Sequence, residues 1–310
     1  MNIFVGTDEI TPITPYPVVA IGNFDGLHLG HQALLQKTVE RAREKGGTAV
    51  VLTFRPHPSQ VLSPKQPTRL LTPFEEKKDL IEACGIDVVL FVEFSKEFAH
   101  QTPAQFAQKL LVEKIGCKEV FVGEQFAFGK NRSGRALDLV ALGKKYGFDV
   151  FPQETVFLNH TLVSSSTIRE LLLLGDVSRA AKMLSRLYAL EGNVIHGDGA
   201  GKQLGFATAN MHLPGRIVPS AGIYAAQTTL LDGLPPHPSI VYIGSKPTFR
   251  DKGEVQIEAH IFDYNKELYG QKLKVSFVEW IRADAKFENS TELVRQMQRD
   301  KKKACAILKI

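Results

Sequence analysis

The sequence predicts an α/β domain with a parallel sheet, followed by a C-terminal antiparallel β-barrel. Three observations lead to this prediction. The chain has 310 residues, more than the roughly 100–200 residues of one ordinary domain. Its first half alternates short β-rich runs with amphipathic helical stretches, whereas its second half holds strand-like runs separated by turns. We therefore expect two domains, covering residues 1–184 and 185–310.

Alternating strands and helices are expected along the first half. The expected strands cover residues 16–24, 48–54, 87–94, 119–124 and 149–155, and the expected helices cover residues 30–46, 72–85, 102–116 and 136–147. Gly46 and Gly47 would end the first helix. Thr72 and Thr102, each followed by proline, are expected helix starts. Strands separated by helices imply right-handed crossovers and a parallel sheet, whose ligands bind at the carboxyl ends of the strands.

The pattern changes after a short helix expected over residues 176–186. Strand-like runs then cover residues 188–195, 222–231, 239–244, 255–263 and 272–281. Five or six strands at this spacing indicate an antiparallel barrel. A last helix over residues 290–308 would cover one side or end of it.

The composition is that of an ordinary globular protein, because 44% of the residues are hydrophobic and 23% are charged. The start of the chain has no basic segment, and Asp8 and Glu9 stand where a signal peptide would need apolar residues. The apolar runs fall short of the roughly 18 residues that span a bilayer. Cys84, Cys117 and Cys305 have no spacing typical of disulfides or metal sites. We expect a cytoplasmic protein without a membrane partner.

The net charge of +5 would suit an anionic ligand such as a nucleotide. Lysines and arginines are nevertheless spread along the chain, and Lys301–Lys303 form the solvated face of the last expected helix. Because no basic stripe alternates with aromatic residues, we expect no nucleic-acid partner. We expect a monomer or a weak homo-oligomer.

The stretch AIGNFDGLHLGH, residues 20–31, joins the first expected strand to the first expected helix. A glycine-containing turn here would present backbone N–H groups at a helix start, which favours phosphate. His28 and His31, three residues apart, fall on one face of that helix. They could donate hydrogen bonds to a triphosphate and offset the charge of departing pyrophosphate. Taken alone, the pair could also be two surface histidines or part of a zinc site.

Strand, loop and helix together resemble the ATP-binding signature of the HIGH-motif nucleotidylyltransferases. The resemblance implies a Rossmann-like domain that catalyses adenylyl transfer. The residues that it assigns to the ATP phosphates are Gly22, Asn23, Phe24, His28 and His31.

Two further segments, GEQFAFGKNRSG (residues 123–134) and VSSSTIRELL (residues 163–172), resemble bacterial FAD synthetase in order and spacing. Hydroxyls and amides at a helix start can hold phosphates, and Arg169 supplies a planar cation to the transferring group. The resemblance adds to the ATP site Ser164, Ser165, Ser166 and Arg169, the last as a catalytic residue.

The segment TFRPHP, residues 53–58, also resembles an element of that family beside the flavin. The residues that the resemblance assigns to flavin binding are His57, Gln125, Phe126 and Phe128. Gln125 departs from the family, which more often has Asp or Asn there. Its side chain can donate and accept hydrogen bonds but offers no carboxylate.

The second half carries a segment, residues 192–210, that resembles the riboflavin kinase signature. Its glycines would let the backbone wrap phosphates, and Lys202 would offset their charge. The residues assigned to kinase ATP binding are Gly197, Lys202, Gly205, Thr208 and Asn210. The last two, Thr208 and Asn210, would also bring oxygens to Mg²⁺. Residues 243–249, 255–277 and 281–287 resemble later elements of the same family in order.

Glu258 corresponds to the general base of that family. The resemblance implies that it accepts the proton of the ribityl 5′-hydroxyl as this oxygen attacks the γ-phosphorus of ATP. From its strand pattern alone, Glu258 could be an outward-facing residue. Ala207 replaces a family proline and Lys246 a frequent arginine, but Thr208, Asn210 and Glu258 are retained. We expect a working kinase.

Nearly the whole chain, domain order included, is similar to the bifunctional riboflavin kinase/FMN adenylyltransferases. The resemblance implies ATP-dependent phosphorylation of riboflavin to FMN in the second domain and adenylylation of FMN to FAD, with release of pyrophosphate, in the first. Riboflavin, FMN and ATP would be the substrates and Mg²⁺ the cofactor. There are two alternatives. One is a HIGH-motif transferase with another phosphorylated acceptor, such as a cytidylyl or pantetheine-phosphate enzyme, and the other is a flavin-binding regulator without turnover. RNA binding ranks last.

Overall fold

The chain folds into two compact units, Met1–Ser165 and Ser166–Ile310. The computed structural model describes residues 1–6, 12–196, 208–213, 215–230, 234–245, 255–264 and 266–310. The helices α7 (Ser165–Leu173) and α8 (Val177–Leu184), which the sequence analysis assigned to the first domain, fall almost entirely in the second unit. A change of sequence pattern and a division by contacts are different criteria, so the boundary at residue 184 stays a prediction.

The first unit contains a six-stranded sheet in which every pairing is parallel, as predicted. In spatial order its strands are β1 (Asn2–Val5), β4 (Val88–Glu93), β3 (Thr48–Arg55), β2 (Pro17–Ile21), β5 (Glu119–Gly123) and β8 (Asp149–Gln153). The edge strand β1 was not predicted. Its four residues are mostly exposed, and they are extended because they pair with β4.

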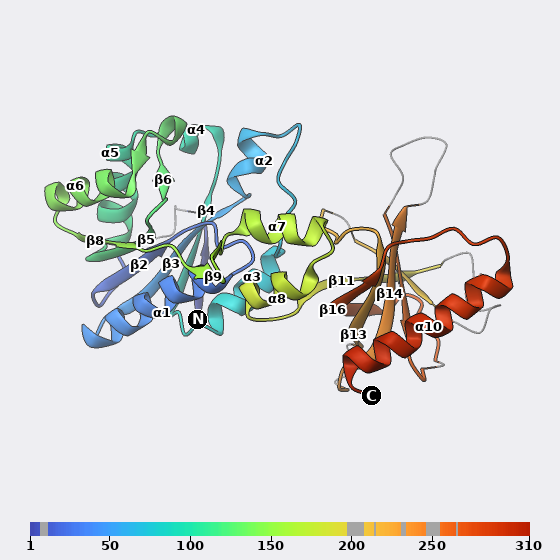
Figure 1. The fold of residues 1–310 in the computed structure, drawn as a ribbon. Helices are drawn as coiled ribbons and strands as arrows, with labels where there is room; N and C mark the ends of the chain where they lie inside the picture. Colours follow the sequence, from blue (N-terminus) through green and yellow to red (C-terminus); the bar gives the residue numbers. More distant parts are fainter. Residues whose placement is uncertain (7–11, 197–207, 214, 231–233, 246–254, 265) are drawn as a thin grey trace. The chain divides into compact units, whose positions relative to one another are not determined.

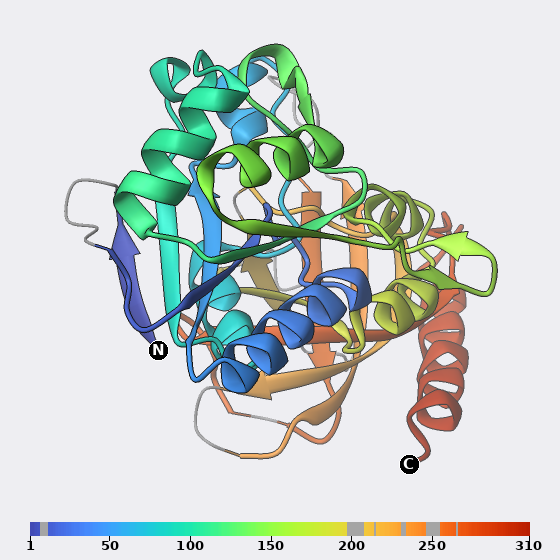
Figure 2. The same cartoon turned by 90° about the vertical axis from the view of Figure 1, so that its left-hand side faces the viewer.

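Helices cover both faces of this sheet (Figures 1 and 2). One face carries α1 (Leu29–Glu44) and α3 (Phe74–Glu82), and the other carries η1 (Phe106–Ile115), a π-helix, and α6 (Ala136–Tyr146). In β2, Val18 and Ala20 pack toward α1 and α3, whereas Val19 and Ile21 pack toward η1 and α6. All five residues of β2 are buried, which explains its uninterrupted apolar run.

Short elements complete the first unit. They are α2 (Pro58–Leu62), α4 (Lys96–Ala99), α5 (Pro103–Gln105), η2 (Lys130–Arg132), and the paired strands β6 (Ala127–Phe128) with β7 (Gly134–Arg135) and β9 (Phe157–Leu158) with β10 (Thr161–Leu162). Thr102 begins α5 as predicted, because its hydroxyl accepts a hydrogen bond from the Gln105 N–H at 3.2 Å. The prediction that Thr72 begins a helix was wrong. Pro73 takes the cap position of α3, and the Thr72 hydroxyl binds elsewhere.

The second unit contains a closed antiparallel barrel, which confirms the predicted architecture. Its strands follow the order β11 (Tyr188–Ile195), β12 (Ala209–His212), β15 (Val255–Ile261), β14 (His237–Ser245), β13 (Gly222–Leu230) and β16 (Lys272–Arg282). The sequence analysis assigned no strand to β12, which is short and follows a glycine-rich run. Its pairing with β11 and β15 closes the barrel. No helix in the described part of the chain is long and apolar enough to cross a membrane.

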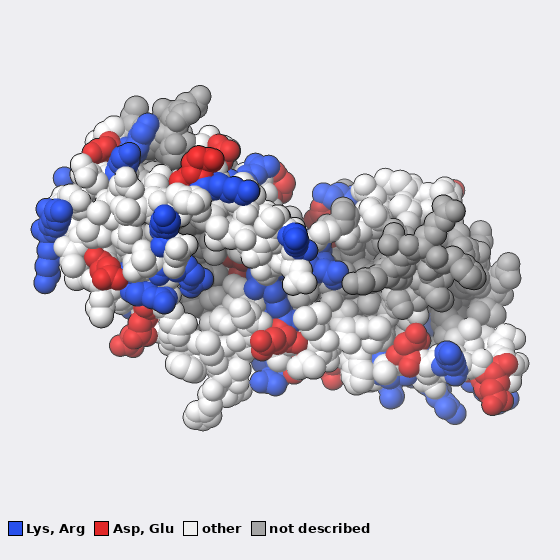
Figure 3. Space-filling view, turned by 90° about the horizontal axis from the view of Figure 1, so that it is seen from above, with Lys and Arg blue, Asp and Glu red and all other residues white. Residues whose placement is uncertain are grey.

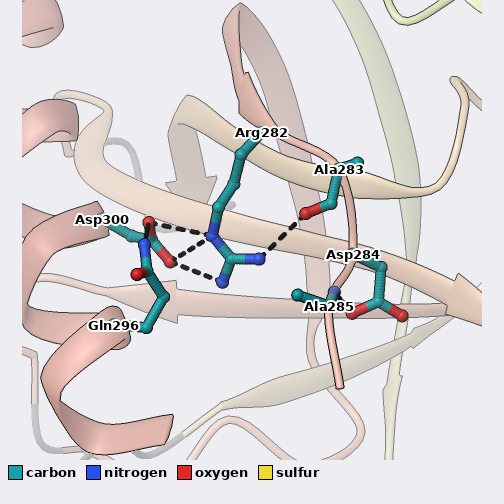
Figure 4. A network of polar contacts seen from close by, with 6 residues as sticks. All are labelled: Arg282, Ala283, Asp284, Ala285, Gln296 and Asp300. Atoms are coloured by element: carbon teal, nitrogen blue, oxygen red, sulfur yellow. Dashed lines mark hydrogen bonds and ion pairs between the residues drawn. The ribbon is translucent and has the colours of Figure 1, made fainter. Parts of the chain in front are cut away.

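The last helix, α10 (Ser290–Leu308), packs on the barrel through Ala304, which contacts a small cluster with Ala225 and Phe262. An ion pair between Arg282 and Asp300 joins this helix to the end of β16 (Figure 4). The Arg282 guanidinium donates to both carboxylate oxygens of Asp300. Its Nε lies 3.1 Å from Oδ1 and 3.0 Å from Oδ2, and its Nη2 lies 2.7 Å from Oδ2.

Replacing Arg282 should destabilise the barrel unit. Arg282→Ala leaves the Asp300 carboxylate, whose side chain is only 3% exposed, without its cationic partner. We expect a loss of about 3 kcal/mol in the free energy of unfolding, measured by urea unfolding with the fluorescence of Trp280, the single tryptophan of the chain. Arg299→Ala, an exposed position on the same helix, is the control. Equal effects of the two substitutions would contradict this account.

Candidate active sites

The loop of residues 22–28 leaves the sheet where the strand order reverses. Ile21, the last residue of β2, pairs with Leu52 of β3 on one side and Val122 of β5 on the other. The chain continues from β2 to β3 and β4 in one direction, and later adds β5 and β8 in the other. Such a switch point at the carboxyl ends of parallel strands is where α/β proteins bind ligands.

The two histidines of the HIGH-like segment lie together at the start of α1. His28 is the N-cap residue, and its Nδ1 accepts a hydrogen bond from the His31 N–H at 3.3 Å. The imidazole rings stack with centroids 3.6 Å apart and planes inclined by 17°. The structure therefore brings together the pair that the sequence analysis assigned to phosphate.

His31 is held in its neutral form. Burial lowers the pKa of His31 well below its ordinary value, and the nearby His28 and Lys77 lower it further. Its Nδ1 atom is buried and has no hydrogen-bond partner within the described residues. In the free protein at neutral pH, His31 is therefore uncharged, and a bound anion would be needed to stabilise its protonated form.

A buried carboxylate that the sequence analysis did not single out fixes this loop. Asp25, 1% exposed, accepts hydrogen bonds from the backbone N–H groups of Leu71 and Thr72, each at 3.0 Å, and from the Thr72 hydroxyl at 3.2 Å. The Thr72 hydroxyl in turn accepts from the Gly26 N–H at 2.9 Å. The loop before α1 is thus tied to the segment that precedes α3.

The buried side chain of Lys77, in α3, binds the same loop. Its ammonium group donates to the Asn23 carbonyl at 2.8 Å. Burial lowers the pKa of Lys77, and the charge of Asp25 opposes that shift. Helical periodicity could not reveal this role, because Lys77 is a buried cation on an otherwise ordinary amphipathic helix.

Phe24 contributes packing rather than an exposed ring. Its side chain is fully buried, with its ring centroid 5.2 Å from that of His31. Its φ of +49° and that of Leu27, +40°, lie in the left-handed region, which is unusual for residues other than glycine. Because its ring is buried, only the backbone of Phe24 could contact a ligand. Close packing favours glycine at position 22, because a Cβ there would lie 3.1 Å from the Phe24 ring.

The serine element lies beside the histidine loop although the two are far apart in sequence. The Ser165 hydroxyl donates to the Asp25 carbonyl at 2.8 Å. Ser164 directly precedes this contact, whereas Ser166 and Arg169 belong to the part of α7 that is counted with the second unit. Their role in the ATP site stays a prediction.

A cavity of about 540 Å³ lies at the carboxyl ends of the strands of the first unit. Gly22 and Asn23 line it, so it reaches the histidine loop, and the predicted flavin residues Gln125, Phe126 and Phe128 line it as well. His57 is not in this lining. Its Nδ1 instead accepts from the Ser59 N–H and caps α2.

Phenylalanine rings form a continuous wall of this cavity. In order of contact they are Phe54, Phe94, Phe98, Phe106, Phe128 and Phe126. Neighbouring ring centroids lie between 5.3 and 6.2 Å apart, within the range of favourable aromatic contacts. Gly129, after the last of these rings in sequence, has φ +73°, and a Cβ there would approach Pro103 to 2.8 Å. The wall is suited to a flat aromatic ligand.

The barrel brings its three predicted chemical residues together. Glu258 lies opposite Asn210 in the register of β12 and β15, and its Oε2 accepts from the Thr208 hydroxyl at 2.9 Å. Gln256, which the sequence analysis missed, donates from Nε2 to Glu258 Oε1 at 2.6 Å and to Asn210 Oδ1 at 3.2 Å. Gln256 lies within a segment that resembles the family, but the sequence analysis gave it no role, and the contacts between the paired strands reveal one.

Tyr242 is a neutral neighbour of this cluster. It lies opposite Glu258 in the register of β14 and β15, and its hydroxyl donates to Asp284 at 3.1 Å. Burial raises the pKa of Tyr242 to about 12, and the hydrogen bond to Asp284 and the charge of Glu258 add to the shift. The other predicted kinase residues, Gly197, Lys202 and Gly205, and the departures Ala207 and Lys246 lie outside the described residues.

Comparison with known proteins agrees with this two-site arrangement. A family model for FAD synthetase matches residues 11–167, and a family model for riboflavin kinase matches residues 184–308. The fold and the two sites thus define the class, an adenylyltransferase-type α/β unit followed by a flavokinase barrel. The chain belongs to the family of bifunctional riboflavin kinase/FMN adenylyltransferases.

Individual relatives match over most of their length. The bifunctional riboflavin kinase/FMN adenylyltransferase of Escherichia coli (strain K12) is 36% identical, with 91% of this chain and 90% of the relative covered. The protein of the same name from Bacillus subtilis (strain 168) is 38% identical, with 93% and 91% covered. A crystal structure described as a macrolide-efflux protein from Streptococcus pneumoniae is similar with a TM-score of 0.88 and 28% identity, covering 97% of this chain and 98% of that one.

Acid should destabilise the first unit through His31. Because its folded pKa lies below the unfolded value of about 6.5, the unfolded state binds more protons, and stability present above pH 6.5 is lost as the pH falls. Between pH 7.5 and 5.5 we expect His31 to account for up to about 1.4 kcal/mol of lost unfolding free energy. Urea unfolding followed by circular dichroism should therefore show a weaker pH dependence for His31→Asn than for wild type. His160→Asn, at an exposed histidine, should behave like wild type.

Proposed function

We propose that the chain converts riboflavin to FAD in two steps, one in each unit. The observation that carries this proposal is that the lining of one cavity, of about 540 Å³, includes both the Gly22–Asn23 loop and the wall of phenylalanines. A flavin ring against that wall would direct its phosphate toward the loop that holds His28 and His31. The barrel has the groups needed for the preceding phosphorylation: Thr208 donates directly to Glu258, and Gln256 bridges Glu258 and Asn210.

In the first unit, an oxygen of the FMN phosphate would attack the α-phosphorus of ATP, and the bond from that phosphorus to the bridging oxygen of pyrophosphate would break. His28 and His31 would donate hydrogen bonds to the departing pyrophosphate. Backbone amides of residues 22–28, Ser164, Ser165, Ser166 and Arg169 would hold the rest of the triphosphate. Gln125, Phe126 and Phe128 would contact the flavin, and His57 would lie close by through α2.

In the barrel, Glu258 would accept the proton of the riboflavin 5′-hydroxyl as this oxygen attacks the γ-phosphorus of ATP. The carboxylate already accepts hydrogen bonds on both oxygens, which fixes its orientation. Thr208 and Asn210 offer uncharged oxygen ligands, which suit a hard cation whose remaining ligands are phosphate oxygens and water. Mg²⁺ held there would neutralise phosphate charge.

We further propose that the protein is cytoplasmic and a monomer or weak homo-oligomer, without a nucleic-acid partner. None of Cys84, Cys117 and Cys305 forms a disulfide bond within the described residues, as is usual in a reducing compartment. On the face of the first unit that Figure 3 shows, basic and acidic side chains lie interspersed rather than in a basic stripe. The substrates would be riboflavin, FMN and ATP.

A product assay tests the two steps together. Purified protein incubated with riboflavin, ATP and Mg²⁺ should form FMN and then FAD, and a parallel reaction started from FMN should form FAD directly. Chromatography separates the three flavins. Absence of both products would refute the proposal, and formation of FAD from added FMN alone would remove the kinase step.

Loss of His28 should affect only the second step. We expect His28→Ala to lower FAD formation from FMN about 100-fold or more while leaving phosphorylation of riboflavin nearly unchanged. Because His28 also caps α1, His28→Asn, which keeps a cap acceptor, separates lost chemistry from lost stability. An equal loss of both activities in folded protein would count against the assignment.

Glu258→Gln should affect only the first step, the phosphorylation of riboflavin. The amide keeps the shape of the side chain but cannot accept the hydroxyl proton, so phosphorylation of riboflavin should fall by at least about 100-fold. FAD formation from FMN should stay close to wild type. The assay is the same, started once from riboflavin and once from FMN, and persistence of rapid FMN formation would exclude Glu258 as the base.

A further inference from the structure

One polar atom in the cavity wall of the first unit is left unsatisfied. The side-chain oxygen of Gln101 is buried, and it has no hydrogen-bond partner within the described part of the chain. Gln101 also lines the cavity of about 540 Å³. Buried polar atoms in native proteins are nearly always hydrogen-bonded, so an unpaired acceptor in a cavity wall indicates a donor on the ligand.

The backbone of Gln101 is fixed on both sides. Its N–H donates to the Phe98 carbonyl at 3.2 Å, and its carbonyl accepts from the Lys130 N–H at 2.7 Å. These bonds join the segment between α4 and α5 to η2, and both segments line the cavity. Since the backbone of Gln101 is held in place without a ligand, only its side chain has to become ordered when the oxygen binds a donor.

The surroundings of Gln101 select what this oxygen can bind. Phe98, Phe106 and Phe128 line the same cavity, so a partner here would bring both an aromatic surface and a hydrogen-bond donor. A carbonyl oxygen accepts hydrogen bonds and cannot donate them. In the oxidised isoalloxazine ring, N1, N5, O2 and O4 are acceptors, and the one N–H donor is at N3.

We propose that Gln101 accepts a hydrogen bond from N3–H of the flavin ring and thereby selects flavins with an unsubstituted N3. The inference rests on the proposed function, because it assigns the cavity to FMN. It adds a specificity-determining residue that reads the pyrimidine edge of the ring, whereas the phenylalanine wall contacts the ring faces.

The test compares FMN with N3-methyl-FMN in wild type, Gln101→Leu and Gln101→Ala. The first variant removes the acceptor at similar size, and the second also makes room for the methyl group. The measurement is kcat/KM for FAD formation, with FMN affinity from quenching of flavin fluorescence. Wild type should prefer FMN by about tenfold or more, because the analogue leaves a buried acceptor unpaired. In both variants this preference should fall to near one, and the loss with FMN should lie mainly in KM.

Controls separate the possible failures. Gln108→Leu, at an exposed position on η1, should keep the full preference for FMN. Riboflavin phosphorylation should be unchanged in the Gln101 variants, which shows that the barrel unit is intact, and an unchanged circular dichroism spectrum shows that the first unit is folded. The same preference in wild type and both variants, or no preference in wild type, would overturn the role of Gln101. If wild type forms no FAD from FMN at all, the proposed function itself fails.

Discussion

The hydrogen bonds of the buried Asp25 carboxylate are the constraint on which the adenylyltransferase site depends. The loop after β2 has left-handed backbone at Phe24 and Leu27, a conformation that requires support from its surroundings. Asp25 supplies it by accepting two backbone N–H groups and a hydroxyl from Leu71 and Thr72. The serine element is joined to the same residue, because the Ser165 hydroxyl donates to the Asp25 carbonyl, and His28 caps the start of α1 three residues later.

The two units position their reactive groups in different ways. In the parallel sheet, the candidate site residues lie on loops that leave neighbouring strands at their carboxyl ends, so Asn23 and Gln125 line one cavity although about 100 residues separate them. In the barrel, chemistry is carried by the strands themselves. Glu258 lies directly across from Asn210 on one neighbouring strand and from Tyr242 on the other. Register therefore fixes the kinase cluster, whereas loop anchoring fixes the adenylyltransferase site.

Local sequence signals account for most of the fold and for the motifs. The uninterrupted apolar run of β2 and the capped helices were predictable because burial and capping act within one segment. β1 and β12 were not, because their extended conformation comes from pairing with distant strands. The same limit applies to the sites. The sequence analysis gave Lys77, Gln101 and Gln256 no role, and each acquires one only through the residues that the fold brings beside it.

The low pKa of His31 bears on how the first site would discriminate between ground state and transition state. Burial and the nearby His28 and Lys77 disfavour its protonated form, so the site is less positive than its residue types suggest. Hydrogen bonding from neutral imidazole and backbone amides would then dominate the binding of ATP. In the proposed reaction the β- and γ-phosphates would gain further negative charge as the bond to the α-phosphorus breaks, and a protonated His31 would become more favourable at that stage. A group whose charge is stabilised by the departing anion favours the transition state over the bound substrate, which is the condition for catalysis.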